Sequence, residues 1–534
     1  MRLTELIAGI QVLRTRLAGD PEITGVTNDS RKVAPGSVFV CVRGYKDDGH
    51  RYVGDALRNG AVAVVTEYDP PLTGADANGV GAPDGQAAWS EIRVADSREA
   101  LAYFSAAFYG YPSSHLSLYG VTGTNGKTTI AYMIEAVMAA AGKSTGLIGT
   151  VETRFETRHG RETLPPGRTT PESSELQATL HRMVEARVTH VAMEASSHAL
   201  ELKRVVACEF DVAIFTNITH DHFDFHDNFE KYLEAKSKLF RELGVNRTKS
   251  RPCYAVINAD DPSAPHMVAE TKHAGVLTFG LDHPADVRAV DIHDLGIGSE
   301  FTVQVPSGLT QRVRLQLPGR FNVSNALSAM AVAYGDGIDL GLAARALGAM
   351  TGVAGRYQLV NADQDFTVMV DFAHNPDALE QILKFGRRFT KKKLYVVFGC
   401  EGAKDKKKRP IMGRIAAHYA DHAIITSDNL YNEDAMSICR TVADGFRSES
   451  DPCGTYDIIP NRREAIERAL DLAETGDMVI IAGKGHETYQ VIGDLHIPFD
   501  DTEVAREIIV QKLGRKRAAA RAAAAGSPAG RQEP

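Results

Sequence analysis

Short apolar runs alternate with helical spacings along most of the chain. SVFVCV from Ser37 and AVAVVTE from Ala61 predict strands in the first hundred or so residues. Later runs predict two more sets of strands, first LSLYGVTG, HVAMEAS, DVAIFTNIT and YAVINADD, then FTVMVDFAH, LYVVFGC, HAIITSDN and DMVIIAGKG. Strands that alternate with helices are typical of parallel sheets covered by helices, so the pattern predicts an α/β protein.

The length of 534 residues is more than one hydrophobic core usually holds. We expect an N-terminal domain over residues 1–110, a central domain over 111–350 and a Rossmann-like C-terminal domain over 351–513. A Gly-, Pro- and Asp-rich stretch from Asp69 to Gln86 predicts a surface loop. The Ala- and Arg-rich residues 514–534 predict a disordered tail.

Composition narrows the class of protein. The hydrophobic share of 43% and charged share of 24% are those of an ordinary globular protein, and a net charge of -8 favours neither nucleic acid nor anionic lipid as a partner. Six scattered cysteines without a CxxC pair predict neither a disulfide framework nor a zinc cluster. With no signal peptide or long apolar stretch, the sequence predicts a cytoplasmic protein that does not insert into membranes.

The strongest chemical motif is GVTGTNGKTT, from Gly120 to Thr129. It lies between a predicted strand and a predicted helix, which is the layout of a phosphate-binding loop. In such a loop Lys127 reaches the β- and γ-phosphates of ATP, and the Thr128 hydroxyl contacts Mg²⁺. The motif departs from the usual pattern because Val121 stands at the first glycine position. The alternative is a glycine turn that only connects a strand to a helix.

Polar residues follow two other central strands. Six carboxylate and imidazole side chains stand there: Glu194, His198, His220, Asp221, His222 and His226. At the edge of a sheet that carries a phosphate-binding loop, such groups suit Mg²⁺ ions that bridge ATP to an incoming acid. Single histidines are more often structural, so the interpretation as a Mg²⁺ site rests on the clustering of these six residues at two strand ends.

Transfer of a γ-phosphoryl group to a carboxylate depends mainly on positioning and charge neutralisation. The site therefore needs cations. Polar segments supply five candidates: Lys127, Arg204, Lys236, Arg356 and Lys484. Taken singly, each is more simply explained as a solvated surface charge.

The motifs become specific in combination. In chain order they are GVTGTNGKTT, TTPESSELQ, MEASSHAL, FTNITHDHFDFH, YLEAKSKLF, NADDP, GRFNVSNAL, VDFAHNPDAL, KKKRPIMG and GKGHETYQ. Together they resemble the Mur ligase family, and within it the enzymes that add the third amino acid of the peptidoglycan peptide. The resemblance extends from NDSRKVAPGSVFV at Asn28 to PFDDTEVA near Asp500.

The resemblance implies three domains, which bind in turn a UDP-sugar, ATP and an amino acid. It implies a monomer whose partners are small molecules: UDP-MurNAc-L-Ala-D-Glu, ATP with Mg²⁺, and a diamino acid. ATP phosphorylates the D-glutamate carboxylate, and the amine then displaces phosphate. The UDP-substrate contacts would be Ser30, Arg31, Gly49, His50, Thr169, Thr170, Ser197 and Arg204. The ATP contacts would be Gly123, Thr124, Asn125, Gly126, Lys127, Thr128, Thr129, Asn322, Asn325, Arg356 and Asp371.

The resemblance also assigns catalytic groups. They would be Lys127, Glu194, His222, Lys236, Arg356 and His374, with the metal held by Thr128, Glu194, His222 and Lys236. Lys236 matches a lysine that the family carries as a carbamate, a change that turns a cation into an oxygen ligand for Mg²⁺. Its alternative is a lysine on a helix surface, as we expect for Lys238.

The sequence does not decide which amino acid is the acceptor. Its expected contacts are Arg409, Asp428, Asn429, Gly483 and Glu487. Relatives that use meso-diaminopimelate carry Asp-Asn-Pro-Arg, whereas this chain has Leu430 and Tyr431 after Asp428 and Asn429, and a tyrosine cannot grip a carboxylate as an arginine does. The segment Asn432-Glu433-Asp434 supplies negative charge that suits a distal ammonium, although acidic residues there are more often part of a solvated surface. Against it, Gly483-Lys-Gly-His-Glu487 has the form found in diaminopimelate enzymes. Lysine, ornithine, diaminopimelate and an unusual amino acid all remain.

Three other functions would share part of this pattern. Another amide ligase of the same superfamily would not need the NDSRKVAPGSVFV block at Asn28. A specialised paralogue would explain Leu430 and Tyr431. A nucleotide-binding scaffold without catalysis would not need Lys127, Glu194, His222 and Lys236 together.

Overall fold

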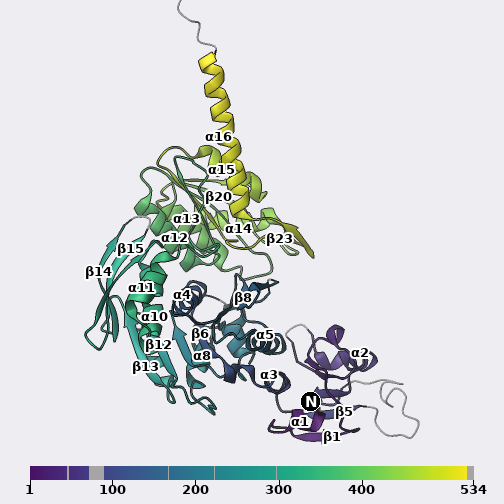
Figure 1. Ribbon diagram of the computed structural model, residues 1–534. Coiled ribbons are helices and arrows are strands. Elements are labelled where there is room, and N and C mark those ends of the chain that lie inside the picture. The colour runs from purple at the N-terminus through teal and green to yellow at the C-terminus, as the bar shows by residue number, and fades with distance from the viewer. Residues whose placement is uncertain are drawn as a thin grey trace, which may run out of the picture.

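The computed structural model describes residues 1–44, 47–70, 89–165, 167–219, 221, 223–295 and 298–525. A five-stranded sheet in the order β1-β5-β4-β3-β2 comes first. Its strands are β1 (Arg14–Arg16), β2 (Gly25–Thr27), β3 (Ser37–Val40), β4 (Ala63–Thr66) and β5 (Ser90–Arg93). The helices of this unit are α1 (Leu3–Ile7), α2 (Val53–Arg58) and α3 (Ser97–Phe108). It lies at one end of the molecule (Figure 1).

The second sheet has eleven strands in the order β16-β15-β14-β13-β12-β11-β6-β10-β7-β8-β9, with a parallel middle and antiparallel edges. The parallel strands are β6 (Ser117–Thr122), β7 (Thr145–Ile148), β10 (His190–Glu194), β11 (Val212–Phe215), β12 (Tyr254–Asn258), β13 (Gly275–Gly280) and β14 (Val287–Asp294). The edges add β8 (Thr153–Thr157), β9 (Gly160–Leu164), β15 (Ser299–Gln304) and β16 (Thr310–Leu315).

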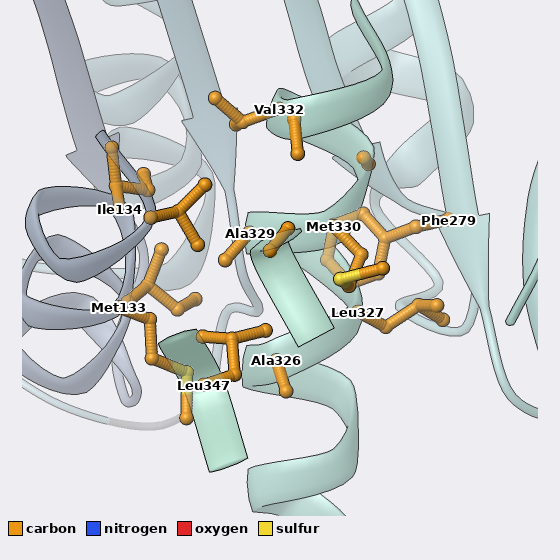
Figure 2. Packing of buried hydrophobic residues seen from close by; sticks show 14 of the residues in the cluster. Met133, Ile134, Phe279, Ala326, Leu327, Ala329, Met330, Val332 and Leu347 are labelled. Carbon is orange, nitrogen blue, oxygen red and sulfur yellow. The ribbon is translucent and has the colours of Figure 1, made fainter. Parts of the chain in front are cut away.

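Helices pack on both faces of this sheet. They are α4 (Lys127–Ala140), α5 (Ser173–Glu185), α6 (Ser197–Glu201), α7 (Phe223–His226), α8 (Phe229–Arg241), α9 (Ala264–Glu270), α10 (Arg320–Gly335) and α11 (Leu340–Ala349). Figure 2 shows one of the two cores, where Met133 and Ile134 of α4 face Ala329 of α10, while Met330 of the same helix lies beside Phe279. The small alanines of α10 let the two helices approach closely, which fixes the start of α4 against the sheet.

The third sheet has six strands in the order β17-β18-β22-β19-β20-β21, parallel except for β17. The strands are β17 (Gln358–Leu359), β18 (Thr367–Asp371), β19 (Leu394–Cys400), β20 (His422–Ser427), β21 (Thr455–Ile458) and β22 (Met478–Ala482). The hairpin β23 (Tyr489–Ile492) and β24 (Leu495–Pro498) follows. The helices are α12 (Pro376–Phe389), α13 (Lys408–Tyr419), α14 (Ala435–Arg447), α15 (Arg462–Leu472) and α16 (Asp501–Ala525).

The α/β fold class is confirmed, and the apolar runs named above all contain a strand. Each sheet lies within one of the three expected domain ranges, whose boundaries stay predictions. The prediction of a disordered tail is wrong for residues 514–525, which continue α16, a helix that projects from the molecule (Figure 1). Alanine has the highest helix propensity, and it extends a helix that has already begun. Residues 526–534 and most of the loop predicted over 69–86 lie outside the described residues.

Candidate active site

The phosphate-binding loop is residues 123–126, between the end of β6 and the start of α4. Gly123 has φ +151°, and a Cβ there would lie 1.8 Å from the Thr216 hydroxyl. Gly126 has φ +88°, which also favours glycine. Val121, the departure from the usual pattern, is a fully buried residue of β6. The loop therefore needs its glycines at 123 and 126, and the strand supplies a packed side chain at 121.

Residues that follow β11 hold this loop from the side. The Thr216 hydroxyl donates to the Asn125 carbonyl over 2.6 Å, and the Asn217 side chain accepts from the Asn125 N–H over 2.9 Å. The Thr124 N–H donates to the Asn217 carbonyl over 2.8 Å. The first half of the TNITHDH motif is thus a brace for the loop, which leaves the loop's shape fixed before any ligand arrives.

Two lysines distant in sequence meet at one carbonyl of the loop. Lys127 Nζ donates to the Gly123 oxygen over 3.0 Å and to the Thr124 oxygen over 2.7 Å. Lys236 Nζ donates to the same Gly123 oxygen over 2.8 Å and lies 4.3 Å from the centre of the Tyr232 ring. Burial, followed by the charge of Lys127, holds the pKa of Lys236 well below its ordinary value. Burial also lowers the pKa of Lys127.

Glu194 closes the same edge of the sheet at the end of β10. Its carboxylate accepts from the Thr150 N–H over 2.7 Å and lies 3.0 Å from the Thr150 hydroxyl. That hydroxyl is in turn 3.0 Å from the Thr169 hydroxyl, and the Thr170 hydroxyl donates to the Glu194 carbonyl over 2.7 Å. The TTPE segment therefore reaches Glu194. His220 and His222 lie outside the described residues.

The third sheet contributes side chains to the same place. Arg356 Nη2 donates to the Thr128 hydroxyl over 3.3 Å, and its guanidinium lies 4.8 Å from the centre of the Phe372 ring. The Asn375 amide donates to the Asp221 carboxylate over 3.1 Å. These contacts join the start of α4 to the segment before β17, and the segment after β11 to the segment after β18.

Asp371 is the last residue of β18 and His374 follows it, and the side chains of both contact backbone groups. The Asp371 carboxylate accepts from the N–H groups of Tyr357 and Ala373, each over 2.8 Å, and burial raises its pKa to about 6. His374 Nδ1 lies 2.9 Å from the Phe372 carbonyl, and burial lowers the pKa of His374 to about 4. An imidazole with that pKa is uncharged at neutral pH, so His374 is a polar contact and not a cation there.

A cavity of about 320 Å³ lies between the second and third sheets beside the loop. Its apolar walls are Phe279, Leu317, Phe321 and Tyr357, and its polar walls include Asn125, Thr128, Asn322, Asn325, Arg356 and Asp371. Thr129 also lines it. The volume is typical of a small-molecule site, and aromatic walls beside a phosphate-binding loop suit a purine nucleotide. Eight of the eleven expected ATP contacts therefore line one cavity, and Gly123, Thr124 and Lys127 belong to the loop beside it.

Arg204 and Ser197 lie beyond the Glu194 end of the site. Arg204 donates to the Thr170 carbonyl over 3.2 Å and pairs with Glu172 over 2.8 Å. Arg204 Nε and the Ser197 hydroxyl are buried with no hydrogen-bond partner among the described residues. Most buried polar groups have a hydrogen-bond partner, so these two atoms are exceptions among the buried side chains of this region.

The residues expected at the uridine diphosphate lie apart from the loop, in the first unit (Figure 1). Ser30 and Arg31 form a 3₁₀ turn, η1 (Ser30–Lys32), in which Arg31 Nε and Nη2 each donate to Asp29 over 2.9 Å. Gly49 and His50 begin η2 (Gly49–Tyr52), where His50 Nδ1 lies 2.7 Å from Asp48. Arg31 is exposed and His50 is buried, so of these two side chains Arg31 is the one that faces solvent.

The expected acceptor residues meet at the carboxyl ends of β20 and β22. The Asn429 amide donates to Glu487 over 3.0 Å, and a Cβ on Gly483 would lie 2.8 Å from the Asp428 carboxylate. Arg409 differs, because its side chain is only 3% exposed and is committed to Glu433 at 3.0 Å and to the Glu401 carbonyl at 3.1 Å. Its two paired nitrogens hold neighbouring loops together.

Sequence reasoning missed several residues of the site. Thr150, which binds Glu194, follows β7 and carries no motif signal. Asn375 and Asp377 carried a signal, because an Asn followed by Pro is typical of a helix start, and Asn375 is the N-cap of α12. Lys484 was one of five unplaced cations, and the structure buries it beside Glu487 at 2.6 Å.

Three family models match the chain in succession. The description "Mur ligase family, catalytic domain" covers residues 22–109, "Mur ligase middle domain" covers 121–333, and "Mur ligase, glutamate ligase domain" covers 355–485. Together they span most of the described residues.

Related sequences match this chain over nearly its whole length. The UDP-N-acetylmuramoyl-L-alanyl-D-glutamate--2,6-diaminopimelate ligase of Geobacillus thermodenitrificans is 44% identical over 515 residues, which is 96% of this chain and all of the relative. The enzyme of the same name from Bacillus velezensis is 44% identical over 92% of this chain and 95% of its own.

Solved structures have the same architecture. A structure of such a diaminopimelate ligase superposes with a TM-score of 0.61 at 32% identity, covering 92% of this chain and 95% of its own. The MurF ligase of Thermotoga maritima, in complex with ADP, superposes with a TM-score of 0.60 at 17% identity over 92% of this chain and 98% of its own. The second likeness supports the fold alone.

Proposed function

The chain belongs to the Mur ligase family, and from this premise we propose that it is an ATP-dependent ligase of the MurE group. It joins the carboxylate of D-glutamate in UDP-MurNAc-L-Ala-D-Glu to the amine of a diamino acid, in peptidoglycan synthesis. The products are the tripeptide, ADP and phosphate. The single observation that carries the proposal is the meeting of Lys127 and Lys236 at the Gly123 carbonyl, beside the ATP-sized cavity.

The cationic groups have distinct tasks in this proposal. Lys127, at the start of α4, and the N–H groups of the loop hold the β- and γ-phosphates. Arg356, now on the Thr128 hydroxyl at 3.3 Å, is within reach of a phosphate bound there. A carboxylate oxygen of the substrate attacks the γ-phosphorus, and ADP leaves. The acceptor amine then attacks the acyl carbon, and the tetrahedral intermediate expels phosphate.

We propose that Mg²⁺ accompanies ATP, held by Thr128, Glu194, His222 and Lys236 as its carbamate. Among the described residues no three His, Cys, Asp or Glu side chains form a ready-made metal cluster. Mg²⁺ is usually held by one or two carboxylates together with water and substrate phosphates. When bound, the ion neutralises charge on the transferred phosphoryl group.

Lys236 suits carbamate formation. Its amine is buried, and burial holds its pKa well below the ordinary value, which favours the neutral form that reacts with CO₂. The amine nitrogen bonds to the carbon of CO₂, one N–H proton is lost, and the product carries one negative charge. A carbamate removes a buried positive charge from beside Lys127 and supplies oxygen ligands, whereas the ammonium supplies none.

The remaining expected residues divide among three substrates. Ser30, Arg31, Gly49 and His50 belong to the uridine diphosphate end, and Thr169, Thr170, Ser197 and Arg204 to the muramyl dipeptide. Asp428, Asn429, Gly483 and Glu487 belong to the acceptor amino acid. The domain ranges 1–110, 111–350 and 351–513 would then bind the UDP-sugar, ATP and the acceptor. Asp371 and His374 belong to the ATP-binding part of the site.

We propose that the protein works in the cytoplasm as a monomer. Its substrates are water-soluble small molecules, and no helix of the described residues has the length and apolar character needed to cross a membrane. Nothing in the net charge of -8 favours a nucleic-acid partner.

Phosphate release tests the function directly. The purified chain is mixed with ATP, Mg²⁺, UDP-MurNAc-L-Ala-D-Glu and one amino acid at a time. We expect stoichiometric phosphate and amide product with at least one diamino acid, and no amide when any component is omitted. Failure with every amino acid, or equal rates without the muramyl dipeptide, contradicts the proposal.

A further inference from the structure

Three carboxylates lie at the carboxyl ends of neighbouring strands of the third sheet. Glu401 follows β19, Asp428 follows β20, and Glu487 follows β22. Lys484 Nζ lies 2.6 Å from Glu487 and 3.8 Å from Asp428. Burial, then the charge of Asp428, raises the pKa of Glu401. Ligands of parallel sheets bind at this edge, where the proposed acceptor contacts also gather.

Only two of these carboxylates have fixed partners. Glu487 accepts from Lys484 over 2.6 Å and from the Asn429 amide over 3.0 Å, and Asp428 accepts from the Asn429 N–H over 2.7 Å. The Glu401 backbone carbonyl accepts from Arg409, but across the described residues no hydrogen bond or salt bridge reaches the Glu401 carboxylate. Lys404 and Lys408 act on it only through longer-range attraction.

Glu433 and Asp434, the acidic residues that the sequence offered for a distal ammonium, are already committed. Glu433 pairs with Arg409 at 3.0 Å and Lys406 at 3.2 Å, and it accepts from the Ala403 N–H over 2.8 Å. The Asp434 carboxylate caps α14 by accepting from the Ser437 N–H over 2.8 Å. Among the described acidic residues Glu401, Glu433 and Asp434, only Glu401 has a carboxylate that no hydrogen bond or ion pair reaches.

The rings of Tyr431 and Tyr489 border the cluster, and each has a lysine of the chain near it. Tyr431 is held in the left-handed region at φ +50° by its hydrogen bonds with Val491 and Gly493. Lys404 Nζ lies 6.0 Å from the centre of its ring, and Lys484 Nζ lies 5.9 Å from that of Tyr489. Ring faces attract cations, and neither tyrosine can pair with a carboxylate as an arginine does.

We infer that Glu401 determines acceptor specificity by binding an ammonium at the end of the acceptor's side chain. The inference rests on the proposed function and names its acceptor class: basic amino acids such as lysine and ornithine, with no carboxylate at the distal end. Diaminopimelate, which the names of the relatives specify, carries that extra carboxylate. In this chain it would meet Glu401 and Tyr431, where like charges repel and no bidentate donor compensates.

Acceptor kinetics test the inference. The wild type and Glu401→Gln are compared with lysine, ornithine, meso-diaminopimelate and norleucine, which has the length of lysine without its ammonium. We expect the wild type to favour lysine or ornithine over both norleucine and diaminopimelate by 10-fold or more. We expect Glu401→Gln to lower kcat/KM for these basic acceptors about 10- to 100-fold, mainly through KM, with little change for norleucine.

The ratio of lysine to norleucine within each variant removes any effect of altered folding. Glu433→Gln is the matched control, because Arg409 already neutralises the charge of Glu433. We expect this variant to leave the ratio of lysine to norleucine unchanged. Wild-type preference for diaminopimelate, or an equal loss for lysine and norleucine in Glu401→Gln, overturns the inference and keeps the ligase. No turnover with any acceptor overturns both.

Discussion

The amide of Asn125 in the phosphate-binding loop donates to the carboxylate of Asp377 on α12 over 2.5 Å. Both residues line the cavity between the second and third sheets. The contact links the element that holds ATP phosphates to the helix that leads away from β18, so the two halves of the site have a direct connection.

Loss of this contact should weaken nucleotide use. In Asp377→Ala we expect kcat/KM for ATP to fall about 10-fold, because a hydrogen bond to a charged partner contributes about 1.5–3 kcal/mol. Initial rates with varied ATP measure this. Glu380→Ala, on the same helix and paired with Lys384 at 2.9 Å, is the control. Equal values for both variants would remove the role given to Asp377.

Lys127→Ala should abolish turnover while the fold persists. Its ammonium is the proposed contact to the transferred phosphate, and we expect kcat to fall more than about 100-fold. Burial lowers the pKa of Lys127, so its removal should not reduce thermal stability. Phosphate release and Tm are measured together, with exposed Lys143→Ala as the control. Near-normal turnover would show that the loop does not serve catalysis.

Lys236→Ala should be inactive and partly restored by a short carboxylic acid, which replaces the carbamate oxygens. Removal of CO₂ should likewise slow the wild type, and bicarbonate should restore its rate. Lys238→Ala is the matched control two residues away, since its amine pairs with Glu201 at 2.6 Å. If the acid gives no rescue and CO₂ has no effect, the carbamate has no part in the mechanism.

Arg462→Met should destabilise the third unit strongly. Arg462 and Asp501 are both fully buried, and Arg462 Nε and Nη2 donate to Asp501 over 2.8 and 2.7 Å. Removing one partner leaves a buried charge uncompensated, which costs about 3–5 kcal/mol. Denaturant unfolding measures this against Arg463→Met, whose exposed pair with Glu507 contributes about 0–1 kcal/mol. Equal stabilities of the two variants would contradict this reading.

The local sequence pattern was sufficient to predict the strands of the sheets and the phosphate-binding loop. Buried parallel strands appear in sequence as apolar runs, and the loop glycines are required by backbone conformation at 123 and 126. The order of the motifs gave the family, which the comparisons confirm. The acidic residues after Tyr431 suggested a site for a distal ammonium, but Glu433 is paired with Arg409. That pairing joins chain segments that only folding brings together, so the sequence pattern did not show it.

The transfer of oxygen from the substrate to phosphate tests the acyl-phosphate account most directly. UDP-MurNAc-L-Ala-D-Glu is labelled with ¹⁸O in the reacting carboxylate, and the phosphate released after one turnover is analysed by mass spectrometry. We expect one ¹⁸O atom in each phosphate formed and ADP as the nucleotide product. Phosphate without ¹⁸O, or label found in AMP, would contradict it.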